Sequence, residues 1–305
     1  METSFTDSLP SDLVNHITAM CGKEGEEWFE SLPAVIKHLE TVWSVSVGQP
    51  FPGIEFNFVA SAVRRGGDLA VVKISPPIDS PEIFGEAKWL ATRAGRGSIE
   101  LIAKDVQSRA ILIEHALPGK SLTECFTGSE LDAIAPAIVV LRSVLNRPPA
   151  DRTDTISLDD WFDGMTRYGV TRFPAGYASK ALKIYEKLSS QTGRTYYLHG
   201  DFHPGNIVTA TRSPFLAIDP KGIIGHMGYE IAVFLNNFHW WQDSRSDIRD
   251  RLDRAVKQFS DAFDISPLEL RQWAFAQMVL SAWWTFDEMP KIYDDEVALA
   301  DIWDV

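Results

Sequence analysis

The order in which strand-like and helix-like segments follow one another constrains the fold of this 305-residue chain most strongly. Residues 55 to 75, 99 to 103 and 110 to 114 have the apolar patterns of strands, with one helical segment, 81 to 93, among them. From residue 129 onward the apolar spacing is helical, interrupted by short apolar stretches between 195 and 225. This order predicts an α+β fold, because a doubly wound sheet would alternate strands and helices throughout.

The chain is predicted to form two parts that meet near Pro118-Gly119, where turn-forming residues interrupt the apolar pattern. Residues 1–117 carry the strands and include a helical N-terminal extension, 1–45, in which apolar residues recur at helical spacing from 11 to 43. Residues 118–305 form the helical part. Its helices are expected at 129–146, 158–168, 175–190, 229–243, 246–263 and 267–286.

Composition and charge exclude several classes of protein. The formal net charge of −13, without a strong basic patch, opposes binding to nucleic-acid phosphates. No apolar run reaches the 18 residues that a membrane-spanning helix needs, and the first residues lack the pattern of a signal peptide. Cys21 and Cys125 lie far apart and outside any metal-binding spacing. These features predict a cytoplasmic protein with two reduced thiols, no nucleic-acid partner and no membrane partner.

The residues best suited to chemistry lie between 197 and 222. An apolar pair leads into His199-Gly200-Asp201, Asn206 follows five residues after Asp201, and Asp219 comes after the apolar stretch 215–218. Phosphoryl transfer needs a carboxylate near the attacking hydroxyl and oxygen ligands that hold magnesium against the phosphates. Asp201, Asn206 and Asp219 supply these groups, and the loop and the returning strand are expected to bring them together.

These residues resemble a known signature. His199-Gly200-Asp201, followed by Asn206 and by Ile218-Asp219, is similar to the catalytic motif of aminoglycoside phosphotransferases and the related choline kinases. The longer string 217–222, with Gly225 and Tyr229-Glu230, resembles the branch of streptomycin 6-phosphotransferases and hydroxyurea phosphotransferases. The resemblance is dense from about 196 to 238 and moderate from 55 to 122. It implies a bilobal, protein-kinase-like fold with the active site between a nucleotide-binding N-terminal lobe and a helical C-terminal lobe.

The resemblance also implies roles in the catalytic loop. Asp201 would be the catalytic base, or would orient the acceptor hydroxyl, while Asn206 and Asp219 would bind Mg²⁺. His199 would be structural and would tie the loop to the metal-binding segment. Glu230 stands where relatives commonly carry Asp, so we expect either that it braces the loop or that it contacts the substrate.

The N-terminal lobe is expected to bind ATP. Lys73 lies inside an apolar strand, where an unpaired ammonium group would be costly, and a kinase pairs such a lysine with ATP phosphates and a helical glutamate. Glu86 is the first choice of partner and Glu82 the second. Glu114, His115 and Ala116 resemble the hinge whose backbone meets the adenine. A glycine-rich loop is missing before Lys73, where residues 53–58 stand instead.

The acceptor is predicted to be a small cationic molecule. Between 121 and 305 there are 26 acidic against 18 basic side chains, and acidic residues dominate 287–305, with Asp287 and Glu288 as candidates for acceptor binding. A solvated acidic tail explains the same residues equally well. The tryptophan pairs 240–241 and 283–284 are predicted to lie in the core rather than to stack on a ligand.

A streptomycin-like aminoglycoside is the first choice of acceptor, in keeping with a role in antibiotic resistance. Hydroxyurea or a small amino alcohol is the alternative. A nucleotide-binding pseudokinase module would belong to another class, but it would need no catalytic carboxylate. A zinc site built from His199, Asp201, His203 and His226 would not explain the presence of Asn206 and Asp219.

Overall fold

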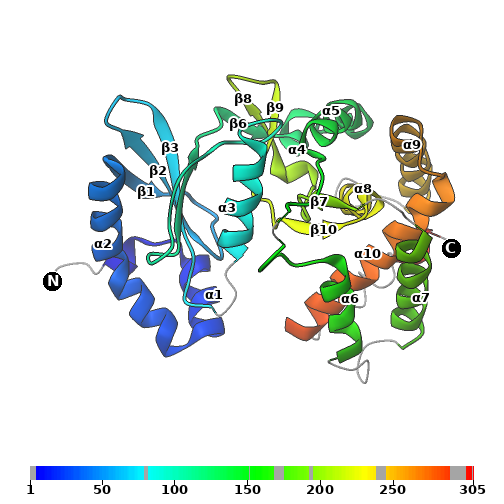
Figure 1. Ribbon diagram of the computed structural model, residues 1–305, viewed down its shortest axis with the longest axis horizontal. Coiled ribbons are helices and arrows are strands. Elements are labelled where there is room, and N and C mark those ends of the chain that lie inside the picture. The colour runs from blue at the N-terminus through cyan, green and yellow to red at the C-terminus, as the bar shows by residue number, and fades with distance from the viewer. Residues whose placement is uncertain are drawn as a thin grey trace. The chain divides into compact units, whose positions relative to one another are not determined.

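A five-stranded antiparallel sheet forms the centre of the first of two structural units, Met1–Leu117 and Pro118–Val305 (Figure 1). The computed structural model describes residues 5–78, 82–150, 152–167, 175–191, 195–237, 245–288, 300–303 and 305. The sheet has the order β1-β2-β3-β5-β4, and we describe each unit separately. Its strands are β1 (Val45–Pro50), β2 (Phe58–Arg64), β3 (Leu69–Ile74), β4 (Leu101–Asp105) and β5 (Ala110–Glu114).

The two faces of this sheet carry different helices. Successive side chains of a strand point to opposite faces, so Val72 and Ile74 share one face of β3 while Lys73 lies on the other. Val72 and Ile74 belong to an apolar cluster with residues of α1 (Ser11–Cys21) and α2 (Lys23–Trp43). Lys73 contacts Glu86 of α3 (Glu82–Arg93), and Figure 1 shows α2 and α3 on opposite sides of the sheet. The face covered by α1 and α2 stabilises the sheet through apolar contacts, and the face covered by α3 carries the buried ion pair.

The helical N-terminal extension consists of the short 3-10 helix η1 (Phe5–Ser8) followed by α1 and α2. The predicted single helix over 11–43 is divided at Gly22, whose φ of +52° ends α1 because it lies in the region that glycine tolerates. Gly25 stays helical and fits closely against α1, since an added Cβ would lie 2.9 Å from the carbonyl oxygen of Ile17.

Strand β1 was not predicted from the sequence. It contains Gly48 and ends at Pro50, two residues that weaken the pattern of a strand. The strand lies at the edge of the sheet, where it pairs only with β2 and its register shifts between Val47 and Pro50. An edge position tolerates proline because one side of the strand needs no sheet hydrogen bonds.

The second unit is mainly helical and contains two small sheets. The three-stranded sheet has the order β6-β8-β9, and β7 pairs with β10 in an antiparallel ribbon. The elements of this unit are β6 (Pro118–Ser121), α4 (Leu122–Cys125), η2 (Glu130–Ala133), α5 (Ile134–Val144), α6 (Leu158–Arg167), α7 (Ala175–Gln191), β7 (Tyr196–Leu198), η3 (Pro204–Asn206), β8 (Ile207–Ala210), β9 (Phe215–Ala217), β10 (Ile223–Gly225), α8 (Met227–Asn236), α9 (Arg245–Phe263), α10 (Pro267–Glu288) and η5 (Asp301–Trp303).

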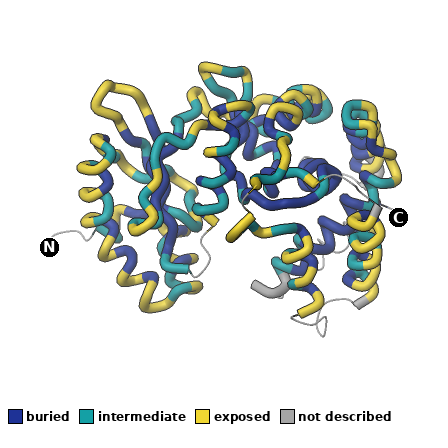
Figure 2. Tube along the Cα trace, in the orientation of Figure 1, coloured by how far each residue is buried: buried dark blue, intermediate teal, exposed yellow. Residues whose placement is uncertain are grey.

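Helix α8 lies at the centre of the second unit. Every one of its residues is buried, as the dark blue coil in Figure 2 shows, and it packs against α10. Gly228 permits this packing, because an added Cβ would lie 2.2 Å from Cδ1 of Trp273 on α10. A helix without an exposed face is held in place on all sides. Its side chains are therefore well suited to position neighbouring loops.

The predicted α+β class is confirmed, with a strand-rich first unit and a helical second unit. The helices expected at 158–168, 175–190, 246–263 and 267–286 correspond to α6, α7, α9 and α10 within one or two residues at most ends. Residues 238–243 of the expected helix 229–243, including Trp240 and Trp241, lie outside the described residues. Among the helices described, none is long and apolar enough to span a membrane.

The contact between Gly228 and Trp273 predicts an asymmetry between two glycines. Gly228 and Gly176 are each the second residue of a helix, but no atom lies within 4 Å of a Cβ built on Gly176. Gly228→Ala should lower the free energy of unfolding in urea by about 2 kcal/mol, because the core must shift to admit a methyl group. Gly176→Ala should leave it unchanged or raise it slightly. Equal effects of the two substitutions would contradict this packing.

Candidate active site

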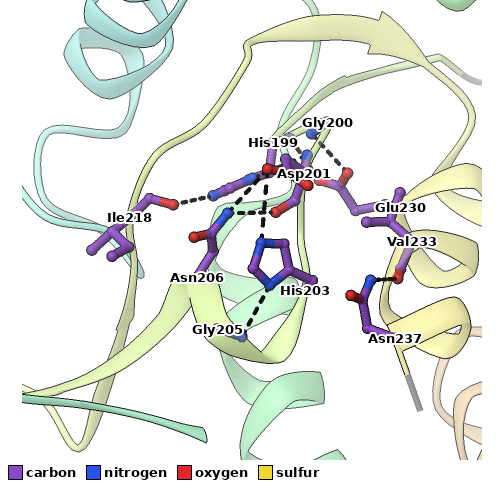
Figure 3. Close-up of polar contacts among 10 residues, drawn as sticks. All are labelled: His199, Gly200, Asp201, His203, Gly205, Asn206, Ile218, Glu230, Val233 and Asn237. Carbon is purple, nitrogen blue, oxygen red and sulfur yellow. Dashed lines mark hydrogen bonds and ion pairs between the residues drawn. The ribbon is translucent and has the colours of Figure 1, made fainter. Parts of the chain in front are cut away.

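The loop from His199 to Asn206 follows β7 and is held by the carboxylate of Glu230 on α8 (Figure 3). The backbone amides of His199 and Gly200 donate hydrogen bonds to its two oxygens, at 2.5 Å and 2.9 Å respectively. Glu230 is fully buried. A buried carboxylate is costly unless its oxygens are hydrogen-bonded, so the loop and α8 depend on each other.

The ring of His199 makes the second attachment of the loop. Its Nε2 lies 2.8 Å from the carbonyl oxygen of Ile218, which only accepts, and its Nδ1 lies 3.3 Å from the amide of Asp201, which only donates. The proton is therefore on Nε2 and the ring is neutral. Complete burial lowers the pKa of His199 to about 3, which keeps the ring neutral at any physiological pH.

The segment that follows Asp219 makes the third attachment. The amides of Lys221 and Gly222 both donate to the carbonyl oxygen of His199, at 2.7 Å and 3.2 Å. Gly200 has a φ of +87°, and an added Cβ would lie 3.1 Å from Cβ of Lys221, so both the backbone and the space favour glycine. Phe202 is buried, and its ring lies against that of Phe234 on α8. The first four residues of the loop are therefore fixed to the core.

These attachments bring Asp201 and Asn206 together. Nδ2 of Asn206 lies 3.0 Å from the backbone oxygen of Asp201 and 3.3 Å from its Oδ2, so the amide donates to both (Figure 3). The side chain of Asp201 keeps 34% of its surface exposed, and Nε2 of His203 lies 3.8 Å from its Oδ2. One carboxylate oxygen is thus oriented by Asn206 while the group remains accessible.

Asp219 is placed beside Asn206 by the pairing of β8 with β9. Ile207 lies opposite Ala217, and the amide of Ile218 donates to the carbonyl oxygen of Asn206 at 2.9 Å. Asp219 follows directly, with a φ of +58° that is unusual for a residue with a side chain. The oxygen Oδ1 of Asn206 and the carboxylate of Asp219 are hard donors of the kind that Mg²⁺ takes from proteins. This donor set fits magnesium.

The histidines of this region do not form a zinc site. Nδ1 of His203 accepts from the amide of Gly205 at 3.0 Å, and Nδ1 of His226 accepts from that of Gly228 at 3.1 Å. Within the described residues, no three His, Cys, Asp or Glu side chains are arranged to hold a metal. The zinc alternative is therefore wrong.

In the first unit, the structure brings Lys73 and Glu86 together. Nζ of Lys73 lies 2.7 Å from Oε2 of Glu86, and the side chains are only 9% and 3% exposed. Glu82, the other candidate, is exposed at the start of α3. Burial makes the charge of Lys73 costly without its partner, so the ion pair fixes the ammonium group at the α3 face of the sheet.

The proposed hinge residues follow β5. The amide of Glu114 donates to the carbonyl oxygen of Glu100. In return, the side chain of Glu114 accepts a hydrogen bond from the amide of Glu100 at 3.0 Å. His115 packs edge-on against Phe51, which lies between β1 and β2. Burial lowers the pKa of His115. Residues 53–58, expected to take the place of a glycine-rich loop, lie between β1 and the first residue of β2.

The structure describes only some of the side chains that were candidates for acceptor binding. Glu230 is buried and its oxygens are bound to the loop, so the possibility that it contacts the substrate is wrong. Asp287 and Glu288 are the last residues of α10, but their side chains lie outside the described part of the chain, as do residues 289–299. Trp283 is buried, as predicted for a core residue, whereas Trp284 is half-buried.

An aromatic group beside the loop was missed by sequence reasoning. Trp161 of α6 lies edge-on to Trp284, with ring centroids 5.0 Å apart, and its ring is 5.8 Å from that of Tyr229. Burial raises the pKa of Tyr229 well above its ordinary value, and the charge of Asp201 contributes. Asp201 is thus within electrostatic range of this group. No local pattern reveals it, because its members come from three helices.

The fold and the loop define a protein-kinase-like phosphotransferase. A family model described as aminoglycoside/hydroxyurea antibiotic resistance kinase matches residues 45–288. The chain belongs to this family.

Two relatives agree with this assignment, and a solved structure shares the fold. A streptomycin 6-kinase of Streptomyces glaucescens is 25% identical over 298 residues and covers 94% of each chain. A hydroxyurea phosphotransferase of Kitasatospora aureofaciens is 25% identical and covers 95% of this chain and 82% of its own. The fold is similar to that of the amicoumacin kinase hAmiN, solved with AMP-PNP, Ca²⁺ and Ami, at 15% identity. That comparison has a TM-score of 0.58 and covers 93% of this chain and 96% of the other.

The two hydrogen bonds of Glu230 predict a strong effect of a small substitution. In Glu230→Gln, one backbone amide would face an NH₂ group instead of an acceptor, so we expect the free energy of unfolding to fall by about 3 kcal/mol. Glu124→Gln is the matched control, because Glu124 also accepts from a backbone amide, that of Ser121, but is exposed. A Glu230→Gln protein as stable in urea as the Glu124→Gln protein would contradict the role of the carboxylate.

His226, which caps α8, predicts a pH dependence of stability. Burial lowers the pKa of His226 from its ordinary 6.5 to about 4, so below pH 6.5 the unfolded chain takes up a proton that the folded protein does not. Stability should fall as the pH drops from 6.5 towards 4. Asn is a good capping residue without a titrating group, so His226→Asn should lose about 1–2 kcal/mol less than the wild type between pH 7 and pH 5. Parallel curves of unfolding free energy against pH would contradict this.

Proposed function

We propose that the protein transfers the γ-phosphoryl group of ATP, with Mg²⁺, to a hydroxyl group of a streptomycin-like aminoglycoside. The observation that carries the proposal is the accessible carboxylate of Asp201, held on a loop that three hydrogen bonds fix to the core. A positioned carboxylate and a positioned nucleotide supply most of what phosphoryl transfer requires from a protein.

Asp201 is proposed to orient the acceptor hydroxyl and to accept its proton as the new O–P bond forms, while the bond between the γ-phosphorus and the β–γ bridging oxygen breaks and ADP leaves. Asn206 donates to Oδ2 of Asp201, which holds the carboxylate and leaves Oδ1 for the acceptor. General-base assistance of this kind contributes about 10²–10⁴ to the rate.

Asn206 and Asp219 are proposed to hold the metal. Oδ1 of Asn206 and the carboxylate of Asp219 would be its protein ligands, and the ion would neutralise charge on the nucleotide phosphates. The kinase of similar fold that was solved with AMP-PNP and Ca²⁺ supports nucleotide and divalent metal as the cofactors. His199 is proposed to keep Asp219 in place by holding the carbonyl of Ile218, the preceding residue.

Lys73 is proposed to bind the phosphates of ATP, with Glu86 as its partner in the absence of nucleotide. The 2.7 Å ion pair supports this, because a buried ammonium held at a fixed position can exchange part of its pairing for a phosphate oxygen. The backbone from Glu114 to Ala116 is proposed to meet the adenine. We therefore propose that Met1–Leu117 is the nucleotide-binding lobe and that Pro118–Val305 carries the catalytic loop and the acceptor site.

The acceptor is proposed to be cationic. The names of the streptomycin kinase and the hydroxyurea phosphotransferase among the relatives give the two leading candidates. The acidic side chains of residues 121–305, 26 against 18 basic, favour the cationic streptomycin over neutral hydroxyurea. The half-buried rings of Trp161 and Trp284 offer faces on which such a cation can lie. Both cysteines are free thiols, in keeping with the cytoplasmic location that we expect.

The proposed function is tested by comparing Asp201→Asn with the wild type. ATP consumption should be measured with streptomycin, hydroxyurea and choline as acceptors, and ATP binding should be measured separately. We expect turnover with streptomycin, a loss of at least about 100-fold in kcat in the variant, and unchanged ATP binding. Asp261→Asn, which alters an exposed carboxylate on α9, is the control.

Each other outcome assigns the protein differently. Turnover with hydroxyurea alone, or with choline alone, would identify that compound and not streptomycin as the acceptor. ATP binding without turnover of any acceptor in the wild type would favour the pseudokinase module. Wild-type turnover by Asp201→Asn would exclude Asp201 as the catalytic carboxylate.

The aromatic group beside the loop predicts an effect on the acceptor alone. Trp161→Ala should raise the KM of the acceptor about fivefold, because a cation loses the ring on which it lies, while the KM of ATP stays unchanged. Trp161→Phe keeps an aromatic face and should restore most of the affinity. An equal rise in both KM values would indicate that Trp161 only stabilises the fold.

A further inference from the structure

A cavity in Pro118–Val305 is not used by the proposed reaction. Its volume is about 350 Å³, and it is lined by residues of the N-terminus of α6, of α7, of the end of β10 and of α10. Small-molecule sites have volumes of about 300–1,000 Å³, with an apolar surface and a few fixed polar groups. The cavity is therefore large enough for a small ligand.

The cavity lies at the opposite end of the β7–β10 ribbon from the catalytic loop. Gly225, which lines the cavity, pairs with Tyr196 at the start of β7, whereas Ile223 pairs with Leu198, the residue before the loop. None of the residues that hold Asp201, Asn206 or Asp219 lines it. The cavity is thus separate from the candidate active site.

Three aromatic rings give the cavity a rigid wall. His226 stacks on Trp273 with ring centroids 5.2 Å apart, and Tyr185 meets Trp273 edge-on at 6.0 Å. Tyr185 also stacks on Phe162, with centroids 4.0 Å apart and planes 7° from parallel. Rings held in this way need no rearrangement to receive a ligand, so little entropy is lost on binding.

Hydrogen bonds fix the polar groups around this wall. The hydroxyl of Tyr185 donates to Oδ1 of Asp159 at 2.5 Å, which leaves the other oxygen of this exposed carboxylate for a ligand. The indole Nε1 of Trp273 is buried against Gly228 of α8, and the carboxylate of Glu269 interacts with it. Nε2 of His226 is 4.0 Å from Glu269. Asp159 is thus the acidic side chain of the described lining that can receive a ligand.

The charges near the cavity favour a cation. Burial raises the pKa of the Tyr185 hydroxyl far above its ordinary value, and the negative charges of Asp159, Asp160 and Asp163 raise it further. Glu269 adds a fourth carboxylate near His226. His226 stays neutral because burial lowers its pKa to about 4, so Arg152 is the only cationic side chain in the described lining.

We propose that this cavity is a binding site for a small organic amine with an apolar body. The ammonium group lies against Asp159, and the apolar body packs on Trp273. Carboxylates and aromatic faces together are the groups that bind organic cations.

The position of the cavity connects such a ligand to the catalytic loop. His226 caps α8, which carries Glu230, and β10 continues from the segment that holds the carbonyl of His199. A ligand that fills the cavity would stabilise the cap and the ribbon together. We therefore expect a bound amine to raise the thermal stability of the whole protein.

The proposal is tested with matched probes on the full chain. Indole N–H signals are followed by NMR, with that of Trp273 assigned from Trp273→Phe, during titration with 2-amino-1-phenylethanol, 1-phenyl-1,2-ethanediol or mandelate. These probes share their shape and are cationic, neutral and anionic. We expect a saturable shift of the Trp273 signal with the amine, at least tenfold weaker binding of the diol, and no binding of mandelate.

Variants separate this site from the candidate active site. Asp159→Asn should weaken binding of the amine at least fivefold, whereas Asp250→Asn, an exposed aspartate on α9, should not change it. Asp201→Asn should leave the Trp273 titration unchanged even if the amine also binds at the acceptor site. A Trp273 signal that does not respond, equal affinity for amine and diol, or unaltered binding to Asp159→Asn would each overturn the proposal.

Discussion

The carboxylate of Glu230 is the group on which the candidate active site depends. It places two acceptors in the interior of the second unit, directly opposite the consecutive amides of His199 and Gly200 that lead from β7 into the loop. The loop could not leave its strand in another direction without abandoning a buried charge. Asp201 therefore receives its position from a residue 29 places away that does not itself contact a substrate.

The rest of the second unit holds this carboxylate in place. Helix α8 is buried throughout, Gly228 admits the ring of Trp273, and the histidine cap at 226 fixes the first turn. The neutral ring of His199 then links the loop to Ile218, so that the same core also positions Asp219. In the first unit the buried pair of Lys73 and Glu86 is fixed in a comparable way by a strand and a helix. In each unit a buried charge is bound by a partner from another element.

The features of the fold and of the candidate site that depend on local sequence patterns were predicted from the sequence. The spacing from Asp201 to Asn206 and Asp219 identified the residues that the structure brings together. The apolar strand around Lys73 predicted its burial, and the resemblance to kinases implied its helical partner. Strand β1 was missed because Gly48 and Pro50 are tolerated only at an edge, which the local pattern does not reveal. The bracing by Glu230 was left open, and the contact of Trp161 with Tyr229 and Trp284 was missed, because both arise from the packing of distant helices.

Native-state hydrogen exchange of the amides of His199 and Gly200 tests the central claim most directly. Both amides are buried and bonded to Glu230, so they should exchange only when the second unit unfolds, at the rate of Leu198 in β7. The exposed amide of Gly53 provides the scale for unprotected backbone. Exchange of His199 and Gly200 at a rate close to that of Gly53 would show that the loop is not held by the carboxylate, and would contradict the account.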